Sequence, residues 1–187
     1  MPNSSATPEP ASPEMAARLA VNRLGRLAPS QRRTVIVAGV VASALLLCPL
    51  AMVIQLVALI ATSDVPAVTT AGVIFTVVGV FFLLLFAGLI FVNARMFIPD
   101  ALGARPVRFA RGPLEVRLTE KKRPELPFSY IVGDYSFAPY VAPPDVEMRP
   151  GAPYIVYYAA QSRVLLSIAA LDAPDAAQWE PQFDSGR

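Results

Sequence analysis

The sequence contains no histidine and one cysteine, Cys48. The absence of histidine excludes serine or cysteine nucleophiles that an imidazole activates. It also excludes histidine-ligated zinc or haem and imidazole proton shuttles. One cysteine cannot form a disulfide within the chain or a cysteine-rich metal site. None of the ten glycines precedes the Lys-Ser or Lys-Thr pair of a phosphate-binding loop. We therefore expect no catalytic residue, no metal site and no cofactor.

Charge is also scarce. Charged residues make up 16% of the chain, against about 25% in soluble domains. Two windows, 34–63 and 65–94, contain no charged residue at all, and each exceeds the roughly 20 apolar residues that cross a bilayer as a helix. The sequence predicts an integral membrane protein with spanning helices at 34–60 and 71–98. The loop between them, 61–70, is short enough to pack them as an antiparallel hairpin.

The arginines indicate the orientation of this hairpin. Five arginines precede the first apolar window, arginines follow the second, and the short loop has neither lysine nor arginine. Because basic residues stay in the cytoplasm, we expect both termini to be cytoplasmic, with the protein in the plasma (inner) membrane. A secretory signal peptide is disfavoured, since the apolar run is about twice the usual 7–15 residues and a second span follows at once.

The segment ahead of the first span divides into two parts. Residues 1–13 are mostly Pro, Ser, Ala and Thr, a composition typical of disorder. Residues 14–29 have a helical period, with alanine and leucine on one side and Arg18, Arg23 and Arg26 on the other. This pattern predicts a basic amphipathic helix lying on anionic lipid. The alternative is a frayed segment whose arginines only fix the topology.

The composition changes after the second span, because twelve of the nineteen prolines lie between Pro99 and Pro181. This density favours short strands and turns over helices. Alternation and turn residues predict strands at 107–110, 114–119, 128–132, 135–141, 154–158 and 164–168. The two-residue turn Gly133-Asp134 joins 128–132 and 135–141 as a hairpin, and the strands at 154–158 and 164–168 form a second hairpin. We expect residues 105–171 to form a small all-β cytoplasmic domain, an SH3-like or OB-like barrel of five or six antiparallel strands. Residues 172–187 would be a flexible tail.

Charges are unevenly distributed over this β region. Residues 95–125 carry eight basic and four acidic side chains, among them Lys121, Lys122 and Arg123. These three are candidates for contact with the lipid surface, although a solvated loop would give the same pattern. Residues 126–187 carry three basic and seven acidic side chains, and this negative charge disfavours nucleic acid despite the many aromatic residues.

The strand at 154–158 is apolar on both faces, whereas a small barrel buries only one face of a strand inside. The other face needs a cover: the membrane, the tail around Trp179 and Phe183, or a partner. Tyrosines are frequent anchors in protein interfaces. We therefore predict a protein-binding face made of Tyr154, Val156 and Tyr158.

Part of this region resembles a known arrangement. The residues Gly151-x-x-Tyr154-x-Val156-Tyr157-Tyr158, continued by Ser162-x-x-Leu165-Leu166-Ser167-Ile168, resemble the end of the β module in small bacterial membrane proteins of uncharacterised function. In those proteins two helices precede a cytoplasmic β domain. The layout is also similar to the NfeD-type membrane proteins, whose helices carry an OB-like barrel. The resemblance implies an architecture and no activity.

These patterns together favour a membrane-anchored, non-enzymatic interaction or scaffold module, in which the helix hairpin fixes the location and the β domain contacts an unknown protein partner. The alternative is an accessory subunit of a larger membrane enzyme or transport complex. Transport by this chain alone is disfavoured, since neither span carries an internal charge. Self-association into a homo-oligomer stays open.

Overall fold

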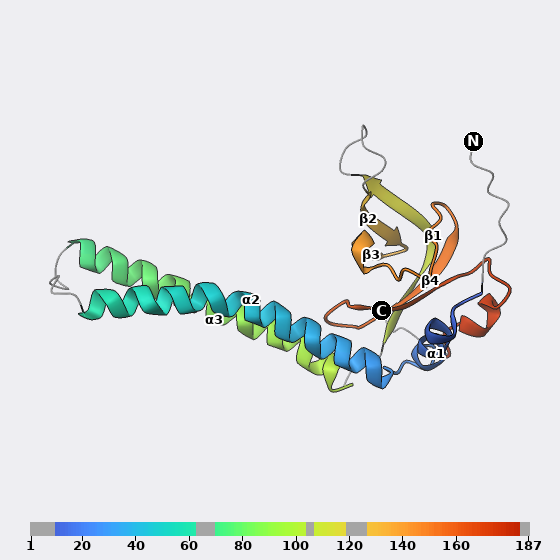
Figure 1. Ribbon diagram of the computed structural model, residues 1–187, viewed down its shortest axis with the longest axis horizontal. Helices are drawn as coiled ribbons and strands as arrows, with labels where there is room; N and C mark the ends of the chain where they lie inside the picture. Colours follow the sequence, from blue (N-terminus) through green and yellow to red (C-terminus); the bar gives the residue numbers. More distant parts are fainter. Residues whose placement is uncertain (1–9, 63–69, 104–106, 119–126, 184–187) are drawn as a thin grey trace. The chain divides into compact units, whose positions relative to one another are not determined.

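The computed structural model describes residues 10–62, 70–103, 107–118 and 127–183 (Figure 1). The chain divides into two compact units. The helical unit comprises residues 33–102, and the β unit comprises residues 1–32 and 103–187.

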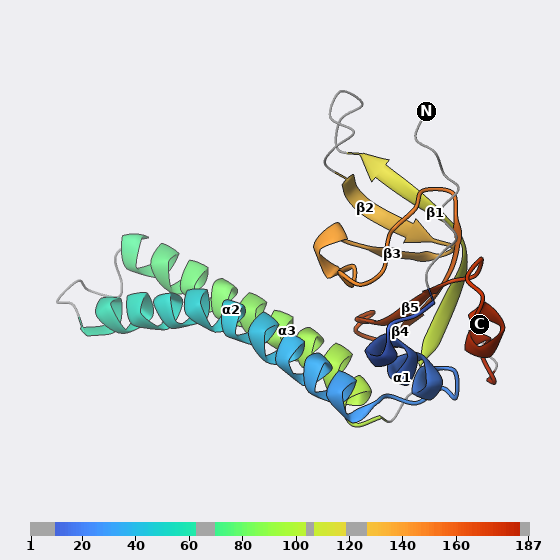
Figure 2. The ribbon, with the colours of Figure 1, turned by 45° about the vertical axis from the view of Figure 1, so that its right-hand side comes forward.

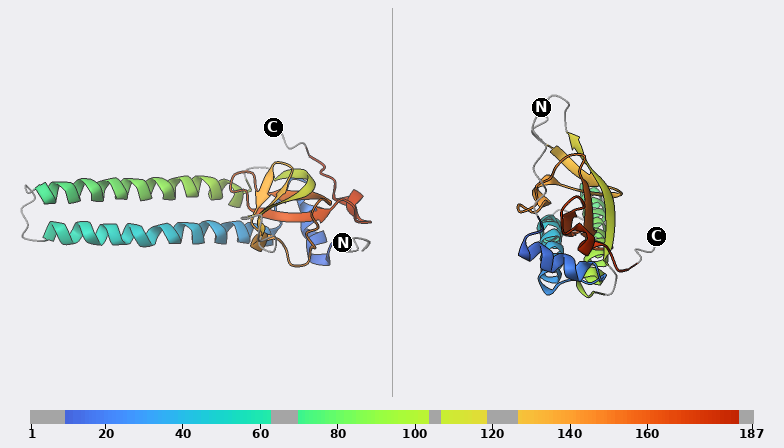
Figure 3. Two further views of the ribbon diagram at one scale, coloured as in Figure 1. Left: turned by 90° about the horizontal axis from the view of Figure 1, so that it is seen from above. Right: turned by 90° about the vertical axis from the view of Figure 1, so that its right-hand side faces the viewer.

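Two long helices form the helical unit, α2 (Pro29–Thr62) and α3 (Thr70–Ala101). They run side by side and antiparallel (Figure 3), as the short connection predicts. Both are long and apolar enough to cross a membrane, and both extend a few residues beyond the expected bounds of 34–60 and 71–98. Most of the predicted loop 61–70 lies outside the described residues.

The β unit is built on one five-stranded antiparallel sheet in the order β3-β2-β1-β4-β5 (Figure 2). Its strands are β1 (Arg108–Leu118), β2 (Pro127–Val132), β3 (Tyr135–Phe137), β4 (Pro153–Tyr158) and β5 (Leu165–Ala170). The two predicted hairpins, β2–β3 and β4–β5, are confirmed. The sheet is curled into a half-barrel, which confirms a layout of two long helices plus a small β domain.

The strand β1 explains the curl. The sequence predicted two strands here, at 107–110 and 114–119, but the structure has one strand of 11 residues. Residues 108–113 of this strand pair with β4, and residues 114–118 pair with β2. The change of partner falls between Pro113 and Leu114. Next to it, a Cβ on Gly112 would lie 3.1 Å from the backbone nitrogen of Gly133. Glycine permits this close approach, and a single bent strand therefore joins both halves of the sheet.

Short helices complete the β unit. The helix α1 (Pro13–Asn22) is capped by Ser12, whose hydroxyl accepts a hydrogen bond from the Met15 amide. It is shorter than the predicted helix at 14–29. Two 3₁₀ turns, η1 (Pro139–Val141) and η2 (Ala176–Trp179), follow β3 and β5. Residues 1–9, predicted to be disordered, lie outside the described residues.

Candidate functional site

The predicted protein-binding face is the inner face of the curled sheet. Tyr154 and Val156 are 0% exposed and Tyr158 is 3% exposed. The hydroxyl of Tyr154 donates to the carbonyl oxygen of Glu147 at 2.6 Å and accepts from the backbone amide of Arg149 at 3.0 Å. The prediction of a binding face at these three residues was wrong, because the curl places their side chains in the core of the β unit.

Arg163 closes one end of this core. The rings of Tyr135 and Tyr158 stack with centroids 4.3 Å apart, and the Arg163 guanidinium lies over both rings. The backbone carbonyl of Arg163 accepts a hydrogen bond from the Tyr135 hydroxyl at 2.7 Å, and its side chain donates to the carbonyl oxygen of Asp134. Arg163 adopts φ +54° in the β4–β5 turn, a conformation that costs free energy for a side chain other than glycine. Its several contacts join the two hairpins, and sequence reasoning did not find them.

The outer face of the sheet is covered by the C-terminal segment. The hydroxyl of Tyr157 donates to the carbonyl oxygen of Trp179 at 2.6 Å. Trp179 is buried, and its indole nitrogen donates to Asp175. Phe183 packs edge-on against Phe109 with ring centroids 5.7 Å apart. The prediction of a flexible tail was therefore wrong for residues 172–183, since these residues supply the cover that the second apolar face requires.

The helix α1 also covers this sheet. It packs on β5, with Met15 2% exposed and Leu19 0% exposed. Arg18 forms an ion pair with Glu14, Arg23 donates to the carbonyl oxygen of Gln178, and Arg26 is exposed. The expectation that this helix lies on lipid needs correction, because its apolar side is already buried against protein. The other lipid-surface candidates, Lys121, Lys122 and Arg123, lie outside the described residues.

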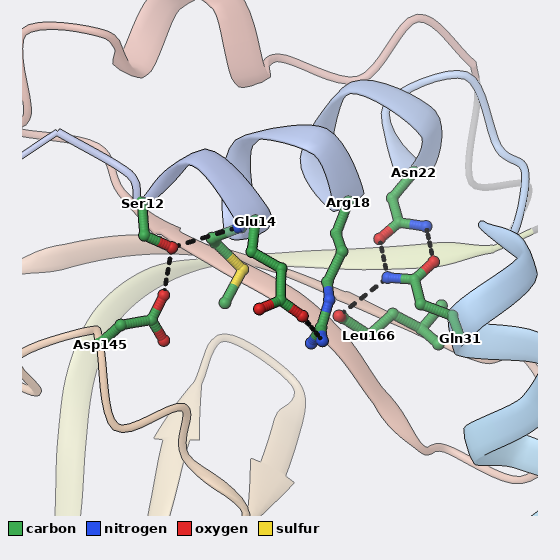
Figure 4. A network of polar contacts seen from close by, with 8 residues as sticks. Ser12, Glu14, Arg18, Asn22, Gln31, Asp145 and Leu166 are labelled. Atoms are coloured by element: carbon green, nitrogen blue, oxygen red, sulfur yellow. Dashed lines mark hydrogen bonds and ion pairs between the residues drawn. The ribbon is translucent and has the colours of Figure 1, made fainter.

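A buried cluster of amide and hydroxyl groups fastens the N-terminal segment to β5 (Figure 4). Asn22 and Gln31 exchange two hydrogen bonds of 2.8 Å. Ser167 donates to Asn22 at 2.7 Å, and Gln31 donates to the carbonyl oxygen of Leu166 at 2.9 Å while accepting from the Ala28 amide. Asn22, Gln31 and Ser167 are at most 3% exposed. Because Gln31 belongs to the first turn of α2, this cluster makes the start of α2 part of the β unit.

A pocket of about 510 Å³ lies where the N-terminal segment meets the loop before β4. Three carboxylates line it, those of Asp145, Glu147 and Asp175. Asp145 accepts a hydrogen bond from the Ser12 hydroxyl (Figure 4), and Asp175 accepts one from the Ala11 amide at 3.1 Å. Arg149, also in the lining, is already paired with Asp172 at 2.7 Å. Asp145 and Asp175 therefore hold residues 11 and 12 in place, which is a structural role.

Exposed aromatic side chains lie elsewhere on the β unit. Phe128 at the start of β2 is 67% exposed, and Tyr140 in η1 is 90% exposed. Both line a groove of about 650 Å³, together with Pro127, Phe137 and Pro139. A buried core that is already complete leaves these rings free for contact with another molecule. The sequence pattern does not distinguish these two rings from the aromatic residues of the core, so sequence reasoning missed them.

Burial of tyrosines predicts an alkaline limit to stability. Burial raises the pKa of Tyr135 and Tyr157 well above 10, while Arg163 and Arg23, respectively, act in the opposite direction. Tyrosines of the unfolded chain ionise near pH 10. Above that pH the unfolded state loses these protons while the folded state keeps them, so the free energy of unfolding falls, whereas below pH 10 these groups leave it unchanged. We expect the urea midpoint of the β unit to fall between about pH 10 and about pH 11. Fluorescence of Trp179, the only tryptophan, reports the transition. Phenolate absorbance from both buried rings in a still-folded chain near pH 10 would contradict this prediction.

Comparison of the chain with protein-family models, with curated proteins and with solved structures gave no match.

Proposed function

We propose that this chain is an integral membrane protein whose α2–α3 hairpin crosses the bilayer and anchors a cytoplasmic β domain that serves as a non-enzymatic interaction or scaffold module. One observation carries the proposal. In the most apolar stretches of α2 and α3, only 11% and 6% of the residues are buried within the chain. The core helix of a soluble protein buries its apolar side chains, whereas a spanning helix exposes them to lipid.

The few polar contacts of the hairpin support this proposal. Asn93 donates to the Ser43 hydroxyl at 2.7 Å and to the carbonyl oxygen of Gly39 at 3.3 Å, and Asn93 is only 7% exposed. Within hydrocarbon, side-chain hydrogen bonds between helices and small residues at close approach are typical of helix association. Asn93 and Ser43 are thus paired between the two helices, whereas many aliphatic and aromatic side chains of the hairpin are exposed.

For the β domain we propose a barrel of the OB-like rather than the SH3-like kind. The order β3-β2-β1-β4-β5, with β1 bent and shared by both halves, supports a partly open five-stranded barrel. The protein partner would contact the exposed rings of Phe128 and Tyr140, since aromatic anchors are enriched in interfaces. We thus propose Phe128 and Tyr140 as the contact residues, instead of the buried face at Tyr154.

The alternative, an accessory subunit of a larger membrane enzyme or transport complex, rests on the same exposed helices, because helices of other subunits can cover them as well as lipid can. The two possibilities differ on purification. A scaffold module behaves as a monomer or small homo-oligomer in detergent, whereas an accessory subunit co-purifies with a fixed set of membrane proteins.

The proposed topology predicts the result of reporter fusions. A cytoplasm-specific reporter after Arg187 is expected to be active, and an externally active reporter inserted at Pro66 is expected to be active too, since the basic residues flank the hairpin only at its ends. Exchanging the two reporters provides the control. External activity of the fusion after Arg187 would exclude the proposed orientation, and a chain recovered in the soluble fraction would exclude membrane insertion.

A further inference from the structure

A second groove lies between the two helices of the helical unit. It has a volume of about 350 Å³, within the roughly 300–1,000 Å³ of small-molecule sites. Its lining is almost entirely apolar and comes from both helices: Ile36, Gly39, Val40, Ser43, Ala44 and Leu47 of α2, with Asn93, Ala94, Phe97, Ile98 and Ala101 of α3. Such a lining suits an aliphatic chain.

The two helices are fastened together at the groove itself. Asn93 donates to Gly39 and Ser43 across the hairpin, with distances of 3.3 Å and 2.7 Å. A Cβ on Gly39 would lie 2.9 Å from the Cβ of Phe97, so the backbone of α2 lies directly against this ring. The hydrogen bonds and the close packing fix the spacing of the helices where the groove forms.

The groove has a cationic side chain at one end. Arg33 precedes Ile36 by three residues and Val40 by seven, which places it on the same face of α2 as the lining. Arg33 is exposed and takes part in no ion pair within the described residues. An apolar groove therefore ends beside a positive charge that lacks an acidic partner in the part of the chain that the structure describes.

We propose that this groove binds an acyl chain of an anionic phospholipid, whose phosphate lies at Arg33. The inference rests on the proposed membrane insertion. The aliphatic lining and the positive charge together select the occupant, because a neutral lipid matches only the groove and a soluble anion matches only Arg33. Basic sites beside spanning helices on the cytoplasmic side attract anionic headgroups.

Equilibrium binding of pyrene-labelled phosphatidylglycerol and phosphatidylcholine tests the site, using the full chain in micelles of an uncharged detergent at low ionic strength. The wild-type chain is expected to prefer phosphatidylglycerol by about tenfold or more. Arg33→Gln is expected to lower the affinity for phosphatidylglycerol about fivefold and to leave phosphatidylcholine unchanged. Ala44→Phe fills the groove and is expected to abolish binding of both lipids, whereas Val41→Phe, at a position outside the lining and 53% exposed, is expected to bind like the wild type.

Three results would overturn the proposal: equal affinity of the wild type for both lipids, binding by Ala44→Phe equal to that of Val41→Phe, or a dimer that Ala44→Phe converts to a monomer. The last result would identify the occupant as a second copy of the chain. Because Arg33 is exposed, Arg33→Gln keeps the fold and tests the charge even if Ala44→Phe fails to fold. The reporter fusions test membrane insertion separately, so loss of lipid preference in a correctly inserted protein refutes the groove alone.

Discussion

Replacing Gln31 by leucine is expected to lower the free energy of unfolding of the β unit by about 2–4 kcal/mol. Gln31 is 3% exposed and joins three separate segments: Asn22 of α1, the Ala28 amide and the Leu166 carbonyl of β5. Leucine matches the size of glutamine but offers no donor or acceptor. The substitution therefore leaves the Ala28 amide and the Leu166 carbonyl without this partner, whereas Asn22 keeps Ser167. Each buried group left unsatisfied costs about 1–3 kcal/mol.

The measurement is urea unfolding of the full chain in detergent, followed through Trp179 fluorescence. Trp179 is the only tryptophan and is buried in the β unit, so the signal reports that unit alone. Gln178→Leu is the matched control, because this glutamine side chain is exposed and the same chemical change there is expected to stay within about 0.5 kcal/mol. An unchanged midpoint for Gln31→Leu would show that the amide cluster does not hold α1 and the start of α2 to β5.

Amide hydrogen exchange distinguishes attachment of the N-terminal segment to the sheet from a general stabilisation of the β unit. If the cluster ties the N-terminal segment to the sheet, Gln31→Leu should speed amide exchange in α1 and in residues 166–168 of β5 more than in β2. Uniform acceleration over the whole β unit would indicate that the cluster stabilises the core without fastening the segment. The pattern of exchange thus tests the role that the geometry assigns.

Composition and local pattern were sufficient for the two long helices and the two hairpins. The charge-free windows predicted the helices because each is apolar throughout and longer than the roughly 20 residues of a spanning helix. The Gly133-Asp134 turn predicted the β2–β3 hairpin because its backbone conformation, φ +60° at Gly133, is local. Such features depend on neighbours in sequence, and one sequence therefore suffices to find them.

The errors concern contacts between distant segments. Tyr154 and Tyr157 lie on opposite faces of β4. Nothing in the local sequence shows that the curl of the sheet buries one face, or that α1 and the C-terminal segment cover the other. The amphipathic pattern of α1 predicted an apolar face correctly, but the same pattern suits lipid and protein equally. The structure resolves the choice through Met15 and Leu19, which pack against β5. Asn22 gave a weaker signal that could have been used. Asparagine is a poor helix former, and contact with lipid gives no reason for an amide at this position of the predicted helix.

Removing the Tyr154 ring is expected to destabilise the β unit rather than to weaken a partner contact. Tyr154 is 0% exposed, and truncation of a buried aromatic side chain to alanine costs about 3–5 kcal/mol. Tyr154→Phe keeps the ring but loses the hydrogen bonds to Glu147 and Arg149, for which about 1–2 kcal/mol is expected. Together the two variants separate packing from hydrogen bonding at one site.

Tyr140→Ala is the matched control, since this tyrosine is 90% exposed and its loss is expected to change the free energy of unfolding by less than about 0.5 kcal/mol. The order of urea midpoints should be wild type and Tyr140→Ala, then Tyr154→Phe, then Tyr154→Ala. If Tyr154→Ala instead unfolds like the wild type, its ring is not part of the core, and the face at Tyr154, Val156 and Tyr158 returns as a candidate for partner binding. If Tyr140→Ala is as destabilising as Tyr154→Ala, the exposed surface proposed for the partner is structural instead.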